Sequence, residues 1–76
     1  MIIAFVLISS DIGYDDQLVA GLETVAGVRE VHSVYGTYDI IAKIEAENSE
    51  KIKKIVFSEI RTLPKVRSTL TLIASQ

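Results

Sequence analysis

Hydrophobic residues recur along this chain with two different periods, and the changes of period divide it into six segments. The first segment, residues 1–9 (MIIAFVLIS), is apolar, β-branched and aromatic almost without a break, which is typical of a central strand buried on both faces. Three more segments have the composition of strands: residues 28–35, 38–45 and 66–74. Apolar residues at helical spacing predict two amphipathic helices, one over residues 17–25 and one that begins after Asn48.

Turn and cap residues separate these segments. Gly27 follows the first helix, as glycine often does at a helix end. Asn48 can cap the second helix, and Pro64 ends it because proline cannot continue the backbone hydrogen bonds. The break at Gly36-Thr37 separates the second and third strands and predicts a hairpin.

A weak internal repeat supports this layout. Residues 24–29 (TVAGVR) resemble residues 62–67 (TLPKVR), and both stretches cover a helix end, a turn and the start of a strand. Two βαβ halves of this kind form a ferredoxin-like sandwich. We therefore predict an α+β fold with the order βαββαβ, in which a four-stranded antiparallel sheet carries two helices on one face. Residues 1–76 are expected to form a single domain.

Composition limits the chemistry that the chain can perform. With 76 residues the core is small, and the absence of cysteine excludes disulfides and thiolate sites. The single histidine, His32, argues against a metal centre, so we expect no metal and no cofactor. Oligomerisation is then the usual support for so small a domain. The net charge of −2 argues against binding of nucleic acid. The apolar stretch at the start is too short to span a membrane, and it lacks the pattern of a signal peptide. We therefore expect a cytoplasmic location.

The sheet face opposite the helices is expected to be apolar at its centre. Both rows of the first strand are apolar: Ile2, Ala4, Val6 and Ile8 on one side, and Ile3, Phe5 and Leu7 on the other. One of these two rows must point away from the helices. Beside it we expect the less apolar row of the third strand (Asp39, Ile41, Lys43 and Glu45) and that of the fourth strand (Thr69, Thr71 and Ile73). A face with an apolar centre and polar margins is typical of an association surface.

Residues 34–41 (VYGTYDII) are the most distinctive stretch of the chain. Together with residues 25–28 (VAGV) and 66–69 (VRST), they resemble the effector-binding (RAM) domain of the Lrp/AsnC, or feast/famine, regulators. The resemblance covers nearly the whole chain in order. It implies dimerisation through the sheets, assembly of dimers into an octamer or decamer, and a small amino acid held at a dimer–dimer contact.

The resemblance also suggests a role in transcription. Full-length members carry an N-terminal helix-turn-helix, whereas here Met1 opens the first strand directly. A stand-alone form of the domain is therefore expected, which does not bind DNA itself and associates with full-length Lrp/AsnC regulators. The alternative is a purely structural oligomerisation partner that binds no ligand. A small dimeric enzyme with His32 as its candidate ligand is less favoured, because no convergent set of catalytic groups is visible.

The resemblance and the chemistry of a zwitterion together suggest a ligand site. Backbone N–H groups of Gly36 and Thr37 are candidates for the carboxylate, and Asp39 is a candidate for the ammonium group. Tyr38 is expected either to line the pocket or to anchor an interface. Thr69 and Thr71 complete the predicted set of ligand contacts. Their hydroxyls could bond the ligand if their row of the last strand faces outward. The alternative is that Gly36 and Asp39 only shape the turn.

Other polar residues are interpreted structurally. Asp11, Asp15 and Asp16 suit a turn and a helix start, where negative charge complements the helix dipole. The basic residues of the second helix are interrupted by Glu50 and Glu59, which indicates a solvated helix face and not a phosphate site.

Overall fold

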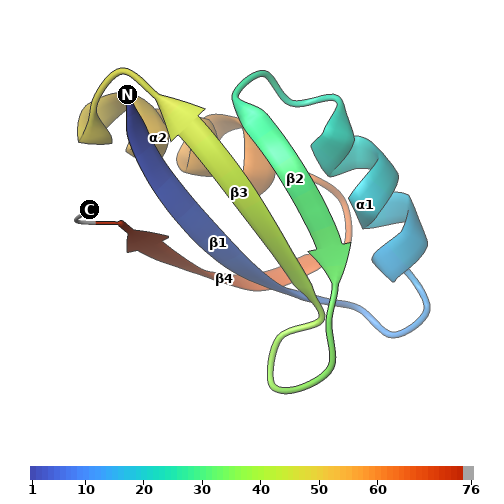
Figure 1. Cartoon of the computed structure of the whole chain (residues 1–76). Coiled ribbons are helices and arrows are strands. Elements are labelled where there is room, and N and C mark those ends of the chain that lie inside the picture. The colour runs from blue at the N-terminus through green and yellow to red at the C-terminus, as the bar shows by residue number, and fades with distance from the viewer. Residues whose placement is uncertain (75–76) are drawn as a thin grey trace.

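The computed structural model describes residues 1–74, which form one antiparallel sheet with both helices packed on the same face (Figure 1). The strand order is β2-β3-β1-β4, with β1 and β3 at the centre. The elements in chain order are β1 (Ile2–Ser10), α1 (Asp15–Glu23), β2 (Val28–Ser33), β3 (Ile40–Ala46), α2 (Ser49–Ile55), the π-helical turn η1 (Val56–Ile60) and β4 (Val66–Ile73). This confirms the predicted ferredoxin-like βαββαβ fold.

The core lies between the sheet and the two helices. The even-numbered side chains of β1 and β3 point towards the helices, and Val6 and Ile40 have no exposed surface. The helices contribute the opposing apolar side chains, which are almost completely buried: Leu18, Leu22, Ile52, Val56 and Ile60. Since the odd-numbered row of β1 is only partly buried, its apolar side chains face away from this core.

The loop between β2 and β3 is longer than the sequence pattern suggested. β2 ends at Ser33 and β3 begins at Ile40, so residues 34–39 form a loop where the strands were predicted to extend to residue 35 and from residue 38. Gly36 has a φ of 139°, a conformation that disfavours any side chain. The Asp39 N–H donates to the Ile8 carbonyl at 2.9 Å, and the Asp39 carbonyl accepts from the Val34 N–H at 2.8 Å, which close the base of the loop.

The second helix begins as predicted and ends differently. Asn48 caps it, because its side-chain oxygen accepts the Lys51 N–H at 2.9 Å. The last turn then widens into η1, where the Arg61 N–H reaches back five residues to the Val56 carbonyl at 2.9 Å. This wider turn keeps both Val56 and Ile60 buried against the sheet.

The internal repeat is confirmed by matching backbone geometry. Gly27 and the equivalent Lys65 both have positive φ, at 95° and 74°. The carbonyl of each accepts a backbone N–H from a distant part of the chain. The Glu45 N–H donates to the Gly27 carbonyl at 2.8 Å, and the Asp11 N–H donates to the Lys65 carbonyl at 3.0 Å. The conformation of Lys65 costs about 1 kcal/mol, and its ammonium lies over the Tyr14 ring, 4.7 Å from the centroid, which offsets part of that cost.

Replacement of Gly27 by alanine is expected to destabilise the fold. A Cβ there would lie 3.0 Å from the Ile55 side chain and 3.1 Å from the Glu45 carbonyl oxygen, in a backbone conformation that already disfavours it. We predict that Gly27→Ala lowers the free energy of unfolding by about 2 kcal/mol. The matched control is Gly21→Ala inside α1, where the new methyl meets only Leu63 at 3.6 Å and helix propensity should raise stability by about 0.5–1 kcal/mol. Urea denaturation of both variants tests this, and equal midpoints would contradict it.

Candidate functional site

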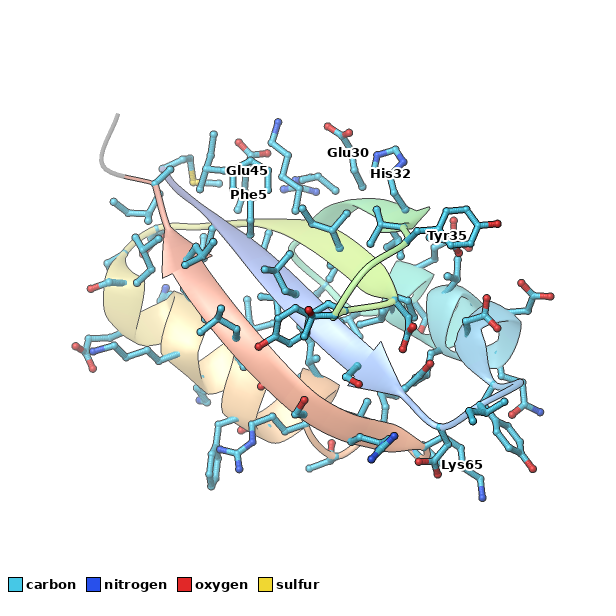
Figure 2. All side chains as sticks on the ribbon, turned by 90° about the horizontal axis from the view of Figure 1, so that it is seen from below. Phe5, Glu30, His32, Tyr35, Glu45 and Lys65 are labelled. Carbon is cyan, nitrogen blue, oxygen red and sulfur yellow. The ribbon has the colours of Figure 1, made fainter. Side chains whose placement is uncertain are left out.

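The sheet face opposite the helices carries a continuous group of apolar side chains. Strand pairing aligns Phe5 with Leu72, and Leu7 with both Ile41 and Leu70, so these side chains share one face. Ile3 belongs to the same row of β1 as Phe5 and Leu7. The apolar side chains of the outer face are therefore Ile3, Phe5, Leu7, Ile41, Leu70 and Leu72. Figure 2 shows Phe5 pointing away from the helices on this side of the sheet.

The prediction that Thr69, Thr71 and Ile73 face outward from β4 is wrong. Thr69 pairs with Ile8 and Thr71 with Val6, and both partners point into the helix-facing core. Thr69, Thr71 and Ile73 therefore lie on the helix side, and the leucines lie on the outer face, where Leu70 is 43% and Leu72 50% exposed. The outer face is consequently more apolar than predicted, because β4 adds two leucines in place of two threonines and an isoleucine.

Charged side chains form the margin of the outer face along β2 and β3. Glu30 pairs with His32 at 3.2 Å and with Lys43 at 3.5 Å, and Arg29 pairs with Glu45 at 3.0 Å. The hydrogen bond with His32, reinforced by the positive charge of Lys43, lowers the pKa of the Glu30 carboxyl below its ordinary value. Figure 2 shows Glu30, His32 and Glu45 on the same side of the sheet as Phe5. The apolar centre thus has a polar rim, as protein interfaces do.

Asp39 holds the end of β1. Its Oδ2 accepts the Ser10 N–H at 3.0 Å and the Ser10 hydroxyl at 3.3 Å. Ser10 is polar and only 6% exposed. The Asp39 carboxylate therefore satisfies the Ser10 N–H, a backbone donor that water reaches poorly. Asp39 therefore has a structural role, and its second carboxylate oxygen has no recorded protein partner among residues 1–74.

The same carboxylate lines a hollow of about 240 Å³ at this end of the sheet. We call it the carboxylate hollow; its lining comes from the β1–α1 turn and the β2–β3 loop and comprises Ser10, Ile12, Gly13, Asp15, Val34, Tyr35 and Asp39. Asp15 and Asp39 give it two acidic groups and no basic one. Such a hollow suits the ammonium group of a small ligand and leaves a ligand carboxylate without a counter-charge.

The structure brings only part of the predicted site to this hollow. Gly36 and Thr37 lie exposed in the β2–β3 loop, and Tyr38 is half-buried there. Thr69 and Thr71 line two other hollows, both beside Arg61. Asp15 and Ile12 were not predicted as site residues; Asp15 was interpreted through the helix dipole, and only the fold places it near Asp39. Whether any of these residues binds a ligand stays a prediction.

Two other kinds of site are absent from the described residues 1–74. None of their helices is long and apolar enough to span a membrane. No cluster of three or more His, Cys, Asp or Glu side chains in that part of the chain could hold a metal ion.

A βαββαβ sandwich with one uncovered apolar sheet face defines the structural class of this chain. Residues 3–76 match the family model described as the Lrp/AsnC ligand binding domain. The chain therefore belongs to the Lrp/AsnC ligand-binding-domain family, and the resemblance drawn from residues 34–41 is confirmed.

Individual relatives agree with this assignment. An uncharacterized HTH-type transcriptional regulator from Pyrococcus furiosus is 39% identical over 74 residues, which are 93% of this chain and 49% of that protein. The chain thus spans about half the length of such curated relatives. A crystal structure of a Thermus thermophilus protein superposes with a TM-score of 0.95 at 34% identity, covering 100% of this chain and 95% of the other.

Two further relatives bear on ligands and on enzymes. A feast or famine regulatory protein from M. tuberculosis, complexed with L-methionine, superposes with a TM-score of 0.85 at 26% identity and covers 100% of this chain and 51% of that one. A homocitrate synthase from Saccharolobus islandicus is 40% identical over 58 residues, which are 76% of this chain and only 12% of the enzyme. The match to the enzyme is therefore confined to a small part of it.

Removal of the Asp39 carboxylate is expected to lower stability as well as any binding. Asp39→Ala leaves the Ser10 N–H without its acceptor, and we predict a loss of about 1.5 kcal/mol in the free energy of unfolding. Asp39→Asn keeps an oxygen acceptor and is expected to lose clearly less. Thermal and urea unfolding of the two variants test this. Equal stability of Asp39→Ala and the unmodified chain would show that the bonds to Ser10 do not contribute.

Proposed function

We propose that this chain is an effector-binding and oligomerisation module of the Lrp/AsnC type. It pairs with a second copy through the outer sheet face, and its dimers assemble further into an octamer or decamer. It binds a small amino acid and modulates transcription in the cytoplasm through association with full-length Lrp/AsnC regulators, without itself contacting DNA. It uses no cofactor and performs no chemistry.

The observation that carries this proposal is the uncovered apolar sheet face. Six apolar side chains lie together there, and a charged rim along β2 and β3 borders them. Burial of apolar surface contributes about 25 cal/mol for each Å² removed from water, so water is a poor solvent for this face. A second copy offers the same apolar centre, and a two-fold pairing of identical faces closes the sheet on both sides.

The carboxylate hollow supports an amino acid as the ligand. Asp15 and Asp39 provide acceptors for an ammonium group, and the open space of about 240 Å³ suits a small molecule. The M. tuberculosis relative was solved as a complex with L-methionine, and this agrees with a ligand of this class. Gly36, Thr37 and Tyr38 belong to the β2–β3 loop, which lines part of this hollow, and they remain candidate contacts for the ligand.

The bonds from Ser10 to Asp39 favour a second candidate function. If the carboxylate serves only to hold the end of β1, the module is a structural oligomerisation partner without a ligand. Titration calorimetry against the twenty amino acids distinguishes the two. We predict binding of at least one amino acid and at least a tenfold weaker affinity in Asp39→Asn, because one charge-assisted contact to the ammonium is lost. If the chain is a well-folded oligomer and binds none of the twenty amino acids, the structural function is the one supported.

A charge at the centre of the outer face is expected to prevent pairing. Phe5→Asp places a carboxylate where the proposed dimer has no water, and we predict a monomer at concentrations at which the unmodified chain is dimeric or larger. Ser58→Asp, an exposed position on η1, adds the same charge on the helix side and should leave the mass unchanged. Size-exclusion chromatography with light scattering gives both masses. Full-size assemblies of Phe5→Asp would contradict pairing through this face.

A further inference from the structure

The helix-facing row of β4 carries two threonines where the matching rows of β1 and β3 are almost entirely apolar. Thr69 and Thr71 pair with Ile8 and Val6, which are completely buried under the helices, yet both threonines are partly exposed. β4 lies at the edge of the sheet (Figure 1), and the second helix leaves its helix-facing side partly open. Hollows of about 580 Å³ and about 470 Å³ follow this row of β4, and the Arg61 side chain lines both of them.

The smaller hollow has the donors of an anion site. We call it the arginine hollow; its lining comprises Arg61, Val66, Arg67, Ser68 and Thr69. It contains two guanidinium groups and two hydroxyls, and no carboxylate lines it. Among residues 1–74, the hydroxyls of Ser68 and Thr69 form no hydrogen bond, and Arg61 forms no ion pair. Guanidinium and hydroxyl donors together match the oxygens of a phosphate group.

A β-bulge places Arg67 in this hollow. Val66 and Ser68 pair with successive residues of β1, so Arg67 lies between them without a partner on that strand. An extra residue of this kind re-aims its side chain, and bulges are over-represented beside functional sites. The ion pair of Arg67 with Asp11 is long, 3.9 Å between Nε and Oδ1, and 63% of the Arg67 side chain is exposed. Its guanidinium is therefore accessible to an anion.

The larger hollow adjoins the arginine hollow at Arg61 and is more apolar. We call it the aromatic groove and define it by Lys53, Lys54, Phe57, Arg61 and Ile73, with Glu50 as its one carboxylate. Phe57 is 66% and Ile73 41% exposed. The Arg61 guanidinium lies over the Phe57 ring, 5.5 Å from the centroid, so an aromatic surface lies directly beside the anion-binding group.

The π-helical turn η1 produces this arrangement. Its wide turn is closed by the bond from the Arg61 N–H to the Val56 carbonyl, five residues back. Because Val56 and Ile60 are both held against the sheet, Phe57 and Arg61, one position after each of them, line the same groove. Single π-helical turns occur frequently at functional sites.

We propose that the two adjoining hollows bind a nucleotide. The arginine hollow takes the phosphates, whose oxygens accept from the guanidinium groups of Arg61 and Arg67 and from the hydroxyls beside them. The base lies in the aromatic groove against Phe57, because every base has a flat face that stacks on an aromatic side chain. Lys53 and Lys54 add positive charge along the groove. A chain of net charge −2 without an extended basic stripe favours a single nucleotide over a nucleic acid.

This nucleotide site is separate from the carboxylate hollow. The arginine hollow and the aromatic groove share no lining residue with it, and their charge has the opposite sign. Nucleotide binding goes beyond the proposed function, and it neither requires nor excludes an amino acid near Asp39.

Titration calorimetry with ADP, adenosine and inorganic phosphate tests this site. We predict saturable binding of ADP, weaker binding of phosphate and no measurable binding of adenosine, because the charged contacts contribute most of the affinity. Arg61→Gln should weaken ADP binding by roughly tenfold or more, since hydrogen bonds with charged groups are the strong ones. Phe57→Ser, at an exposed position, should weaken binding of ADP and leave that of phosphate nearly unchanged.

The matched control is Lys51→Gln. It removes one positive charge from the same helix at a residue that pairs with Glu47 and lines neither hollow, so ADP affinity should stay the same. Circular dichroism of all three variants checks that they are folded. A glutamate-rich peptide serves as a second anionic probe.

The outcomes separate a nucleotide from other anions. Loss of ADP affinity in Arg61→Gln and Phe57→Ser, with the control unaffected, supports the site. A folded, unmodified chain that gives no heat with ADP at low ionic strength overturns it. Unchanged ADP affinity in Phe57→Ser overturns it too, because the base then contributes nothing, and so does a glutamate-rich peptide that binds as tightly as ADP. The titration with the twenty amino acids decides separately on the carboxylate hollow, so failure of ADP binding leaves the proposed function standing.

Discussion

β1 carries apolar side chains on both of its faces, and the rest of the structure follows from that constraint. Its even-numbered row is covered by the two helices, which leaves Val6 and Ile8 without exposed surface. Its odd-numbered row is only partly buried by the neighbouring strands, and no helix of the described residues 1–74 covers it. Since Phe5 and Leu7 are joined on the outer face by leucines of β4, the uncovered area extends over several strands. A monomer would keep this face in water, whereas pairing of two copies buries it.

The sequence predicted the fold because its local signals agree with one another. The unbroken apolar run of β1, the Asn48 cap and the repeat around Gly27 and Lys65 all indicate the same layout. It did not predict the face on which the β4 side chains lie. Residues 69–72 alternate threonine and leucine, so either row could face outward. A register shift opposite Ser9 and Ser10 prevents counting of the rows from the start of the strand. The π-helical turn was also missed, because its buried side chains fit the apolar spacing of an ordinary helix.

The candidate site was predicted only in part, for a different physical reason. Asp39 of the β2–β3 loop lies 29 positions after Ser10 in the chain, and its hydrogen bonds with Ser10 and with the Ile8 carbonyl bring the loop to the end of β1 and the β1–α1 turn. Asp15 joins Asp39 in the carboxylate hollow for that reason and not through any local motif. Thr69 and Thr71 face the helix side, where Arg61 is their neighbour. Acidic and basic groups suited to a zwitterion are thus both present on the chain but line separate hollows.

We propose that a second copy of this chain covers the outer sheet face. Sedimentation equilibrium of the unmodified protein, from low to high micromolar concentration, measures whether this pairing occurs, since one chain has a mass of 8.4 kDa. We predict a mass of at least two chains at every concentration, with further growth as dimers assemble. A folded protein that sediments as an 8.4 kDa monomer throughout would contradict the claim.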